Sequence, residues 1–228
     1  MHFLRIVAAV AWKDLVVEWR TREIVSTMLF FAVIVVLIFS FAFLEEGRAS
    51  GDAVAGILWS ATAFSGTLGL SRAADRERDG DALRALLLSP ASRAALYLGK
   101  MVGIVLFMLV TEVVVVTLST ILFHARLGAH LFELAGLLAL GTVGYSAVGA
   151  LFALMLGRSR SREVLLTVML YPIIVPVIIA GSKGTSALLE DIPNLGSARG
   201  WIRFLLAFDA VFLTLALWAF EPLAGDRT

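Results

Sequence analysis

The chain has 228 residues, of which 60% are hydrophobic and 16% are charged. Soluble domains are about 45–50% apolar and about 25% charged, so this composition indicates a membrane protein with no separate soluble enzyme domain. The formal net charge of +1 excludes nucleic-acid binding driven by bulk charge, and the absence of cysteine excludes disulfides, thiolate metal sites, iron–sulfur clusters and cysteine nucleophiles.

Six apolar runs approach or exceed the roughly 20 residues that a helix needs to cross a bilayer. The predicted spans are residues 24–44, 53–71, 101–123, 134–157, 164–181 and 204–220. The first run starts too late and is too long for a cleaved signal peptide. The sequence therefore predicts an all-α integral membrane protein, with six transmembrane helices in a single domain over residues 1–228.

The distribution of Lys and Arg predicts the orientation of the chain. Six spans place both termini on the same side of the membrane. The segments on that side carry fourteen of the 19 Lys and Arg residues, and the three connections on the other side carry five. Because cytoplasmic segments hold the excess of positive charge in membrane proteins, we expect both termini in the cytoplasm.

Residues 3–22 precede the first span and form an amphipathic pattern. One face of the helical wheel carries apolar side chains, namely Leu4, Ala8, Trp12, Leu15, Val16 and Trp19. Asp14, Glu18 and Thr21 point the other way. Such a helix lies in the headgroup region with its tryptophan rings at the boundary. The alternative is a plain cytoplasmic extension of the first span.

The long cytoplasmic connection between the second and third spans holds two short helical patterns. The first covers residues 81–88, with Asp81 as its N-cap, and Ser89-Pro90 ends it. Its apolar face consists of Leu83, Leu86 and Leu87. This face is suited either to docking a cytosolic partner or to packing back on the bundle. The second pattern, residues 92–100, leads into the third span.

Two acidic residues fall inside predicted spans. Glu112 lies at the midpoint of the third span, where an ionisable group costs several kcal/mol unless it faces the bundle interior or becomes protonated. It is either a substrate or coupling site, or a protonated side chain bonded to a neighbouring helix. Asp209 lies near the start of the sixth span and suits an anchoring or packing role, with a place on the substrate pathway as the alternative.

The fifth span is the most irregular of the six. Pro172 and Pro176 each remove a backbone donor, and Tyr171 precedes the first of them. Such breaks are tolerated in membranes where they are buried in protein or line a cavity, so we expect this span to line the pathway, with a static kink as the alternative. The Gly, Pro and Asn residues of 182–203 then predict an extracytoplasmic loop with a short interfacial helix.

Small residues recur at helical spacing in the second and fourth spans. They are Ala61, Ser65 and Gly69, then Thr142, Ser146 and Ala150, with Gly141, Gly144 and Gly149 nearby. Small side chains let membrane helices approach closely, so these positions predict helix packing.

Motifs for enzyme and cofactor chemistry are sparse. His124 and His130 flank a short extracytoplasmic connection, and two histidines in a loop are a weak signal for haem ligation. The sequence has no phosphate-binding loop of the form G-x-x-x-x-G-K-[ST], no H-E-x-x-H and no G-x-S-x-G. We therefore expect no catalytic residues, no metal site, and no ATP bound by a phosphate-binding loop of this chain.

These features leave three kinds of function open. The chain fits a transport subunit that another protein powers through the cytoplasmic loop. It also fits a secondary transporter driven by protons through Glu112, or a non-transporting membrane scaffold.

The order of segments along the chain resembles one known family. The stretch from the second span into the third carries an acidic run followed by leucines and a proline, namely Asp79, Asp81, Ala82, Leu83, Leu86, Leu87, Leu88, Ser89 and Pro90, and then Arg93, Tyr97, Gly99 and Lys100. Later segments continue the match with SREVLLTVMLYPIIVPVIIAG and RFLLAFDAVFLTLALWAFE. The series is similar to the haem exporter protein B (CcmB) family, although Ser26-Thr27 stands where some members carry Asn-Pro.

The resemblance implies a mechanism and a set of partners. Family members are permease subunits of an ABC transporter in the bacterial inner membrane that serves cytochrome c maturation. Two copies would pair with two cytosolic ATPases, which bind the ATP. Helix 81–88 would be the coupling helix, with ATPase-coupling residues Asp79, Asp81, Leu83, Leu86, Leu87, Leu88 and Pro90.

Haem enters through the same resemblance, as substrate rather than as resident cofactor. The implied partners include a haem-handling membrane subunit and a haem chaperone outside the membrane. The subunit would export haem, or would use ATP hydrolysis to release haem-loaded chaperone from its partner.

Overall fold

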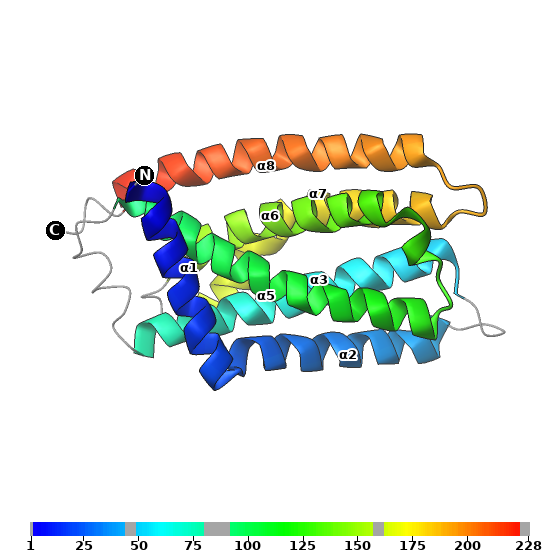
Figure 1. Cartoon of the computed structure of the whole chain (residues 1–228), viewed down its shortest axis with the longest axis horizontal. Helices are drawn as coiled ribbons and strands as arrows, with labels where there is room; N and C mark the ends of the chain where they lie inside the picture. The colour runs from blue at the N-terminus through cyan, green and yellow to red at the C-terminus, as the bar shows by residue number, and fades with distance from the viewer. Residues whose placement is uncertain (1, 44–48, 80–91, 157–161, 224–228) are drawn as a thin grey trace.

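The computed structural model describes residues 2–43, 49–79, 92–156 and 162–223, and all regular structure within them is helical (Figure 1). The long helices are α1 (His2–Thr21), α2 (Glu23–Phe43), α3 (Gly51–Asp79), α5 (Arg93–Leu122), α6 (Leu131–Met155), α7 (Arg162–Leu189) and α8 (Leu195–Leu223), and a short 3-10 helix, η1 (Leu127–His130), precedes α6. The helices α2, α3, α5, α6, α7 and α8 are long and apolar enough to cross a membrane. The predicted all-α fold with six spans is therefore confirmed.

The spans form a bundle with a crowded centre. Helices α3, α5, α6 and α7 pack against one another, while α2 contacts α3 and α5 at one edge and α8 contacts α6 and α7 at the other. In Figure 1, α8 and α2 are accordingly the outermost helices at the top and bottom. Within the most apolar segment of each helix, 72% of the residues of α3 are buried but only 17% of those of α8. The difference arises because α8 lies at the edge of the bundle and presents one broad face to its surroundings.

The helices are longer than the apolar runs alone predicted. Residues 92–100 do not form a separate short helix, because α5 begins at Arg93 and continues without a break to Leu122. The predicted extracytoplasmic loop 182–203 is also wrong: α7 extends to Leu189 and α8 starts at Leu195. Only residues 190–194 connect them, and Asn194 caps α8 by accepting the Ser197 N–H at 3.0 Å.

Close packing accounts for the glycines at the end of α7. A Cβ at Gly181 would overlap the Trp59 ring, and a Cβ at Gly184 would lie 3.2 Å from that of Trp201. These residues are close-approach positions on a packed helix rather than turns. Likewise α7 runs through Pro172 and Pro176 without interruption, so the expected break is wrong.

Helix α1 lies across the other helices at one end of the bundle, the end at which α8 finishes (Figure 1). Val10 and Ala11 are buried, and α1 packs on α5, where a Cβ at Gly99 would lie 2.6 Å from that of Val10. Trp12 and Trp19 are 69% and 78% exposed. The apolar face thus points outward, as an interfacial helix requires, and the acidic face points towards the bundle.

Candidate functional site in the helical bundle

Glu112 lies in the interior of the bundle. It projects from α5, is 2% exposed, and accepts a hydrogen bond at Oε1 from the Thr142 hydroxyl of α6. Its Oε2 has no hydrogen-bond partner among the described residues. The structure therefore places Glu112 towards its neighbouring helix, as a buried ionisable group in a membrane requires.

Asp209 is also buried, at 4% exposed, and lies where α8 meets α6. Its carboxylate lies against Gly144, and any Cβ at that position would overlap Oδ1. Neither carboxylate oxygen has a hydrogen-bond partner within the part of the chain that the structure describes. The missing side chain at Gly144 is what makes room for an acid at this helix contact.

A hydroxyl cluster joins three helices nearer the end of the bundle that bears α1. The Thr67 hydroxyl of α3 lies 2.7 Å from the Tyr145 hydroxyl of α6 and 3.4 Å from the Tyr171 hydroxyl of α7. Tyr145 also donates to the Ala63 carbonyl at 2.9 Å. Tyr171 therefore belongs to a polar contact between helices, although its assignment to a substrate pathway stays a prediction.

A small cavity lies beside these polar groups. Its lining comes from four helices, namely Trp59, Thr62, Ala63, Met108, Gly141, Thr142, Tyr145, Val177 and Ile178. It has room for about one water molecule, which is far too little for a haem group. In this conformation the cavity therefore is not a haem passage.

The two prolines of α7 stand apart from this cavity. The Pro172 side chain is exposed and that of Pro176 is half-buried, whereas Val177 and Ile178 of the same helix line the cavity. Glu112 is hydrogen-bonded to Thr142, and the Tyr171 hydroxyl lies 3.4 Å from that of Thr67, but no hydrogen bond within the described residues joins Glu112, Tyr171 and Asp209 to one another. A shared pathway through these residues remains a prediction.

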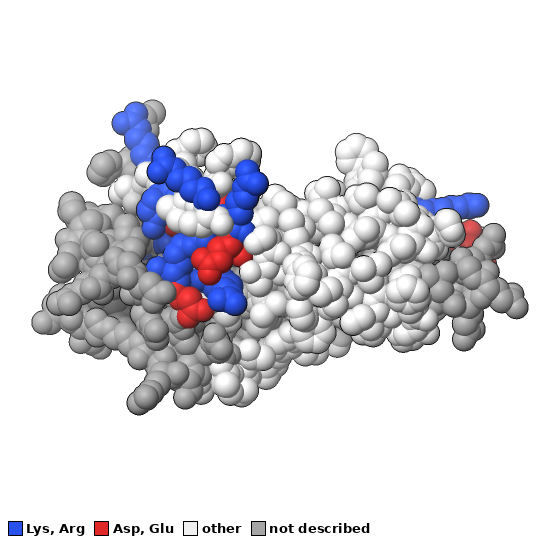
Figure 2. Space-filling view, turned by 90° about the horizontal axis from the view of Figure 1, so that it is seen from below, with Lys and Arg blue, Asp and Glu red and all other residues white. Residues whose placement is uncertain are grey.

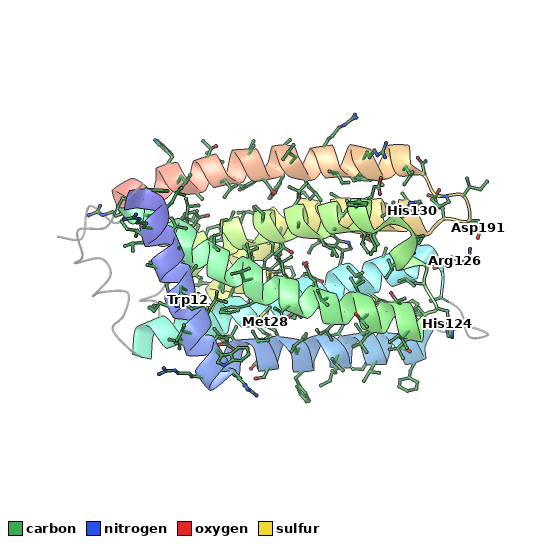
Figure 3. All side chains as sticks on the ribbon, viewed as in Figure 1. Trp12, Met28, His124, Arg126, His130 and Asp191 are labelled. Carbon is green, nitrogen blue, oxygen red and sulfur yellow. The ribbon has the colours of Figure 1, made fainter. Side chains whose placement is uncertain are left out.

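The two histidines flank the connection between α5 and α6, at the end of the bundle opposite α1 (Figure 3). His124 is exposed, with a φ of 51°, and His130 is half-buried immediately before α6. No group of three His, Asp or Glu side chains that could hold a metal occurs among the described residues. Haem ligation by this pair stays an untested expectation.

The predicted coupling residues lie mostly outside the described part of the chain. Asp79 is the last residue of α3, while Asp81, Leu83, Leu86, Leu87, Leu88 and Pro90 lie outside the described residues. The helices on either side are described: α3 ends at Asp79 and α5 begins at Arg93. Helix α1 packs against α5, and its acidic residues pair with basic residues of both α3 and α5.

Two ion pairs connect α1 to the helices that flank the predicted coupling segment. Glu18 is 5% exposed, and its Oε2 pairs with Arg76 of α3 at 2.6 Å. Asp14 pairs with Lys100 of α5, which is 7% exposed, at 2.9 Å. These contacts were not predicted from the sequence. The signal that could have revealed them is the spacing of Asp14 and Glu18, four apart on the face of α1 opposite its tryptophans.

Glu18 also stabilises the bend between α1 and α2. Its Oε1 accepts the Val25 N–H at 2.8 Å, which satisfies one of the free backbone donors in the first turn of α2. The bend itself occurs at Arg22, whose φ of 53° is in the left-handed region. A single carboxylate thus holds three helices, α1, α2 and α3, in place.

The hydrogen bond between Thr142 and Glu112 gives a stability prediction. We expect Thr142→Val to reduce the free energy of unfolding by about 1–3 kcal/mol, because it leaves a buried carboxyl oxygen without its donor. The double variant Thr142→Val/Glu112→Leu is expected to recover most of that loss, since both polar partners are then gone. Thermal unfolding in detergent measures both, and equal stability of the single variant and the wild type would contradict the buried bond.

Comparison with known proteins agrees with this architecture. The family model described as CcmB protein matches residues 5–223, which run from α1 to the end of α8. A relative from Pseudomonas aeruginosa, named Heme exporter protein B, is 26% identical over 200 residues, which cover 88% of this chain and 87% of the relative. The chain is a multi-pass membrane protein that belongs to the CcmB family.

Proposed function

We propose that this chain is the transmembrane permease subunit of an ABC transporter for cytochrome c biogenesis, with ATP hydrolysed on a separate cytosolic subunit. The observation that carries the proposal is the match to the CcmB family model, which extends from residue 5 to residue 223. That range includes the predicted coupling segment, the six spans and all but the first three residues of α1. The protein would reside in a bacterial inner membrane, where such a family member serves haem export.

The end of the bundle that bears α1 suits contact with an ATPase. Helices α3 and α5 lead away from the bundle centre to Asp79 and Arg93, on either side of the predicted coupling helix. Figure 2 shows Lys and Arg gathered with acidic residues at this same end, next to a broad uncharged band over the spans. Fourteen of the 19 Lys and Arg residues lie in the segments on the same side of the membrane as the termini, and such an excess is typical of the cytoplasmic side.

The interior of the bundle bears on how haem is handled. Its small cavity between α3, α5, α6 and α7 is far below the size of haem. This favours a subunit that transmits movement from the ATPase to a haem-handling membrane partner, and so releases haem-loaded chaperone, over one that passes haem through its own centre. Two copies of the subunit would work with two ATPases.

The test is co-purification from detergent of wild-type protein and of Leu83→Asp, Leu87→Asp and the double variant. We expect a stoichiometric ATPase to co-purify with the wild type. The amount that co-purifies with the double variant should fall by about tenfold or more, because a buried charge at an apolar contact costs several kcal/mol. Ile192→Asp is the matched control, since Ile192 is 86% exposed at the opposite end of the bundle.

The outcomes separate the proposal from its alternatives. Loss of the ATPase in the double variant but not in Ile192→Asp supports the permease proposal. Wild-type protein without an ATPase contradicts it, and proton-coupled transport through the buried Glu112 then becomes the function to test. An ATPase that stays bound to the double variant contradicts the coupling helix.

A further inference from the structure

Helix α1 carries its acidic residues on the side that faces the bundle and its basic residues on the outward side. Its two acids, Asp14 and Glu18, face the bundle and pair with Lys100 and Arg76. Its basic residues Arg5 and Arg20 are exposed, and Lys13, although 3.0 Å from Asp14, keeps 42% of its side chain exposed. Because the acids are turned inward, the outward surface of α1 is strongly positive.

Helical spacing aligns these basic residues with the tryptophans. Arg5, Trp12 and Trp19 are seven residues apart, almost two helical turns, and therefore lie in one row along the helix. Lys13 and Arg20 follow the same spacing one residue later and form a parallel row beside them. The outward face of α1 thus combines two tryptophan rings with three cationic groups.

The orientation of α1 places this face where lipid headgroups are. The helix lies across the spans at one end of the bundle, and so runs along the plane of a membrane that the spans cross (Figure 1). Figure 3 shows Trp12 at this end, far from the connections that carry His124 and His130. Tryptophan rings prefer the headgroup level, and Lys and Arg beside them attract anionic lipids.

We propose that the outward face of α1, formed by Arg5, Trp12, Lys13, Trp19 and Arg20, binds anionic phospholipid headgroups of the membrane. The positive charge of this face selects anionic over neutral lipids. The ion pairs of Asp14 and Glu18 hold the face in its outward position. Binding of lipid there holds α1, and through it α3 and α5, at a fixed depth in the headgroup layer.

The test compares lipid retention in nanodiscs of phosphatidylcholine alone and mixed with phosphatidylglycerol. The full chain is extracted, and bound lipids are counted by native mass spectrometry. The variant Arg5→Gln/Lys13→Gln/Arg20→Gln leaves the pairs of Asp14 with Lys100 and Glu18 with Arg76 intact. The control Arg126→Gln/Lys183→Gln/Arg203→Gln removes three exposed charges at the opposite end.

The wild type is expected to retain phosphatidylglycerol over phosphatidylcholine, and to lose it at high salt. Each basic group beside an anionic surface contributes about fivefold in affinity, so the α1 variant should lose at least roughly tenfold, and the control variant less than about twofold. Equal retention by the α1 variant and the wild type overturns the proposal. The proposal is also overturned if phosphatidylglycerol retention by the wild type does not change with salt concentration. That measurement does not depend on how the variants fold.

A third result also overturns it. If the α1 variant keeps its lipids but loses a co-purifying protein subunit, this face binds a protein rather than the membrane. Loss of lipid with the ATPase retained supports the proposal, and its outcome is separate from that of the Leu83 and Leu87 variants.

Discussion

Replacing Arg76 with alanine is expected to lower the unfolding temperature of this protein by about 10 °C. Arg76 Nη2 lies 2.6 Å from Oε2 of Glu18, and Glu18 is 5% exposed. Removing one partner of a buried ion pair leaves an uncompensated charge and costs about 3–5 kcal/mol. Because 23% of the Arg76 side chain is exposed, we expect the lower part of that range. Thermal unfolding monitored by size exclusion measures the shift.

The same helix provides a matched control for Arg76. Arg72 lies 3.9 Å from Glu23, and about half of each side chain is exposed. Exposed ion pairs contribute at most about 1 kcal/mol, so Arg72→Ala should change the unfolding temperature by no more than about 4 °C. The double variant Arg76→Ala/Glu18→Gln should be more stable than Arg76→Ala, since the buried charge is gone. Equal effects of the two arginine variants would show that Glu18 does not depend on its partner.

This ion pair bears on the proposed mechanism as well as on stability. Helix α1 is bonded to α3 through Glu18 and to α5 through Asp14, and these two helices flank the predicted coupling segment. A displacement of that segment would therefore move α1 together with both spans. In this view α1 moves together with α3 and α5. Its ion pairs hold it to these two helices, and its outward face keeps it at the membrane surface.

The number of spans could be predicted because each apolar run had to satisfy its own backbone hydrogen bonds in the bilayer. The helix ends could not, because Gly and Pro end helices in water but are tolerated in membrane helices that pack closely. Gly184, which suggested a loop, instead packs against Leu137, just as Gly181 at the end of the predicted span packs against Trp59. Pro172 and Pro176 remain inside α7.

The candidate site was predicted only in part. A single acid in an apolar run is conspicuous, which is why Glu112 and Asp209 could be identified from the sequence. Their neighbours Thr142 and Gly144 depend on the rotation of α6 against α5 and α8, which one sequence does not specify. The small residues Ala61, Ser65, Thr142, Ser146 and Ala150 are buried, as packing positions should be.

The second large effect is expected at Trp59. Its ring is 3% exposed and fills the space left by two glycines, Gly141 of α6 and Gly181 of α7. Its Nε1–H donates to the buried Thr185 hydroxyl at 3.0 Å. Trp59→Ala removes the ring between three helices and is expected to cost about 3–5 kcal/mol in the free energy of unfolding. Trp218→Ala is the control, because Trp218 is 74% exposed on α8 and its loss leaves no cavity.

Glycine substitutions test the same contact from the other side. An alanine normally stabilises a helix by about 1 kcal/mol relative to glycine, and Gly56→Ala, with open space around its Cβ on the helix that carries Trp59, should show that gain. Gly181→Ala should instead destabilise by about 1–3 kcal/mol, because its Cβ overlaps the indole ring. Combining Gly181→Ala with Trp59→Leu should restore part of the loss, since the smaller side chain vacates the overlap. If the two glycine variants behaved alike, the ring would not be held between α6 and α7, and the close approach of these helices would need another cause.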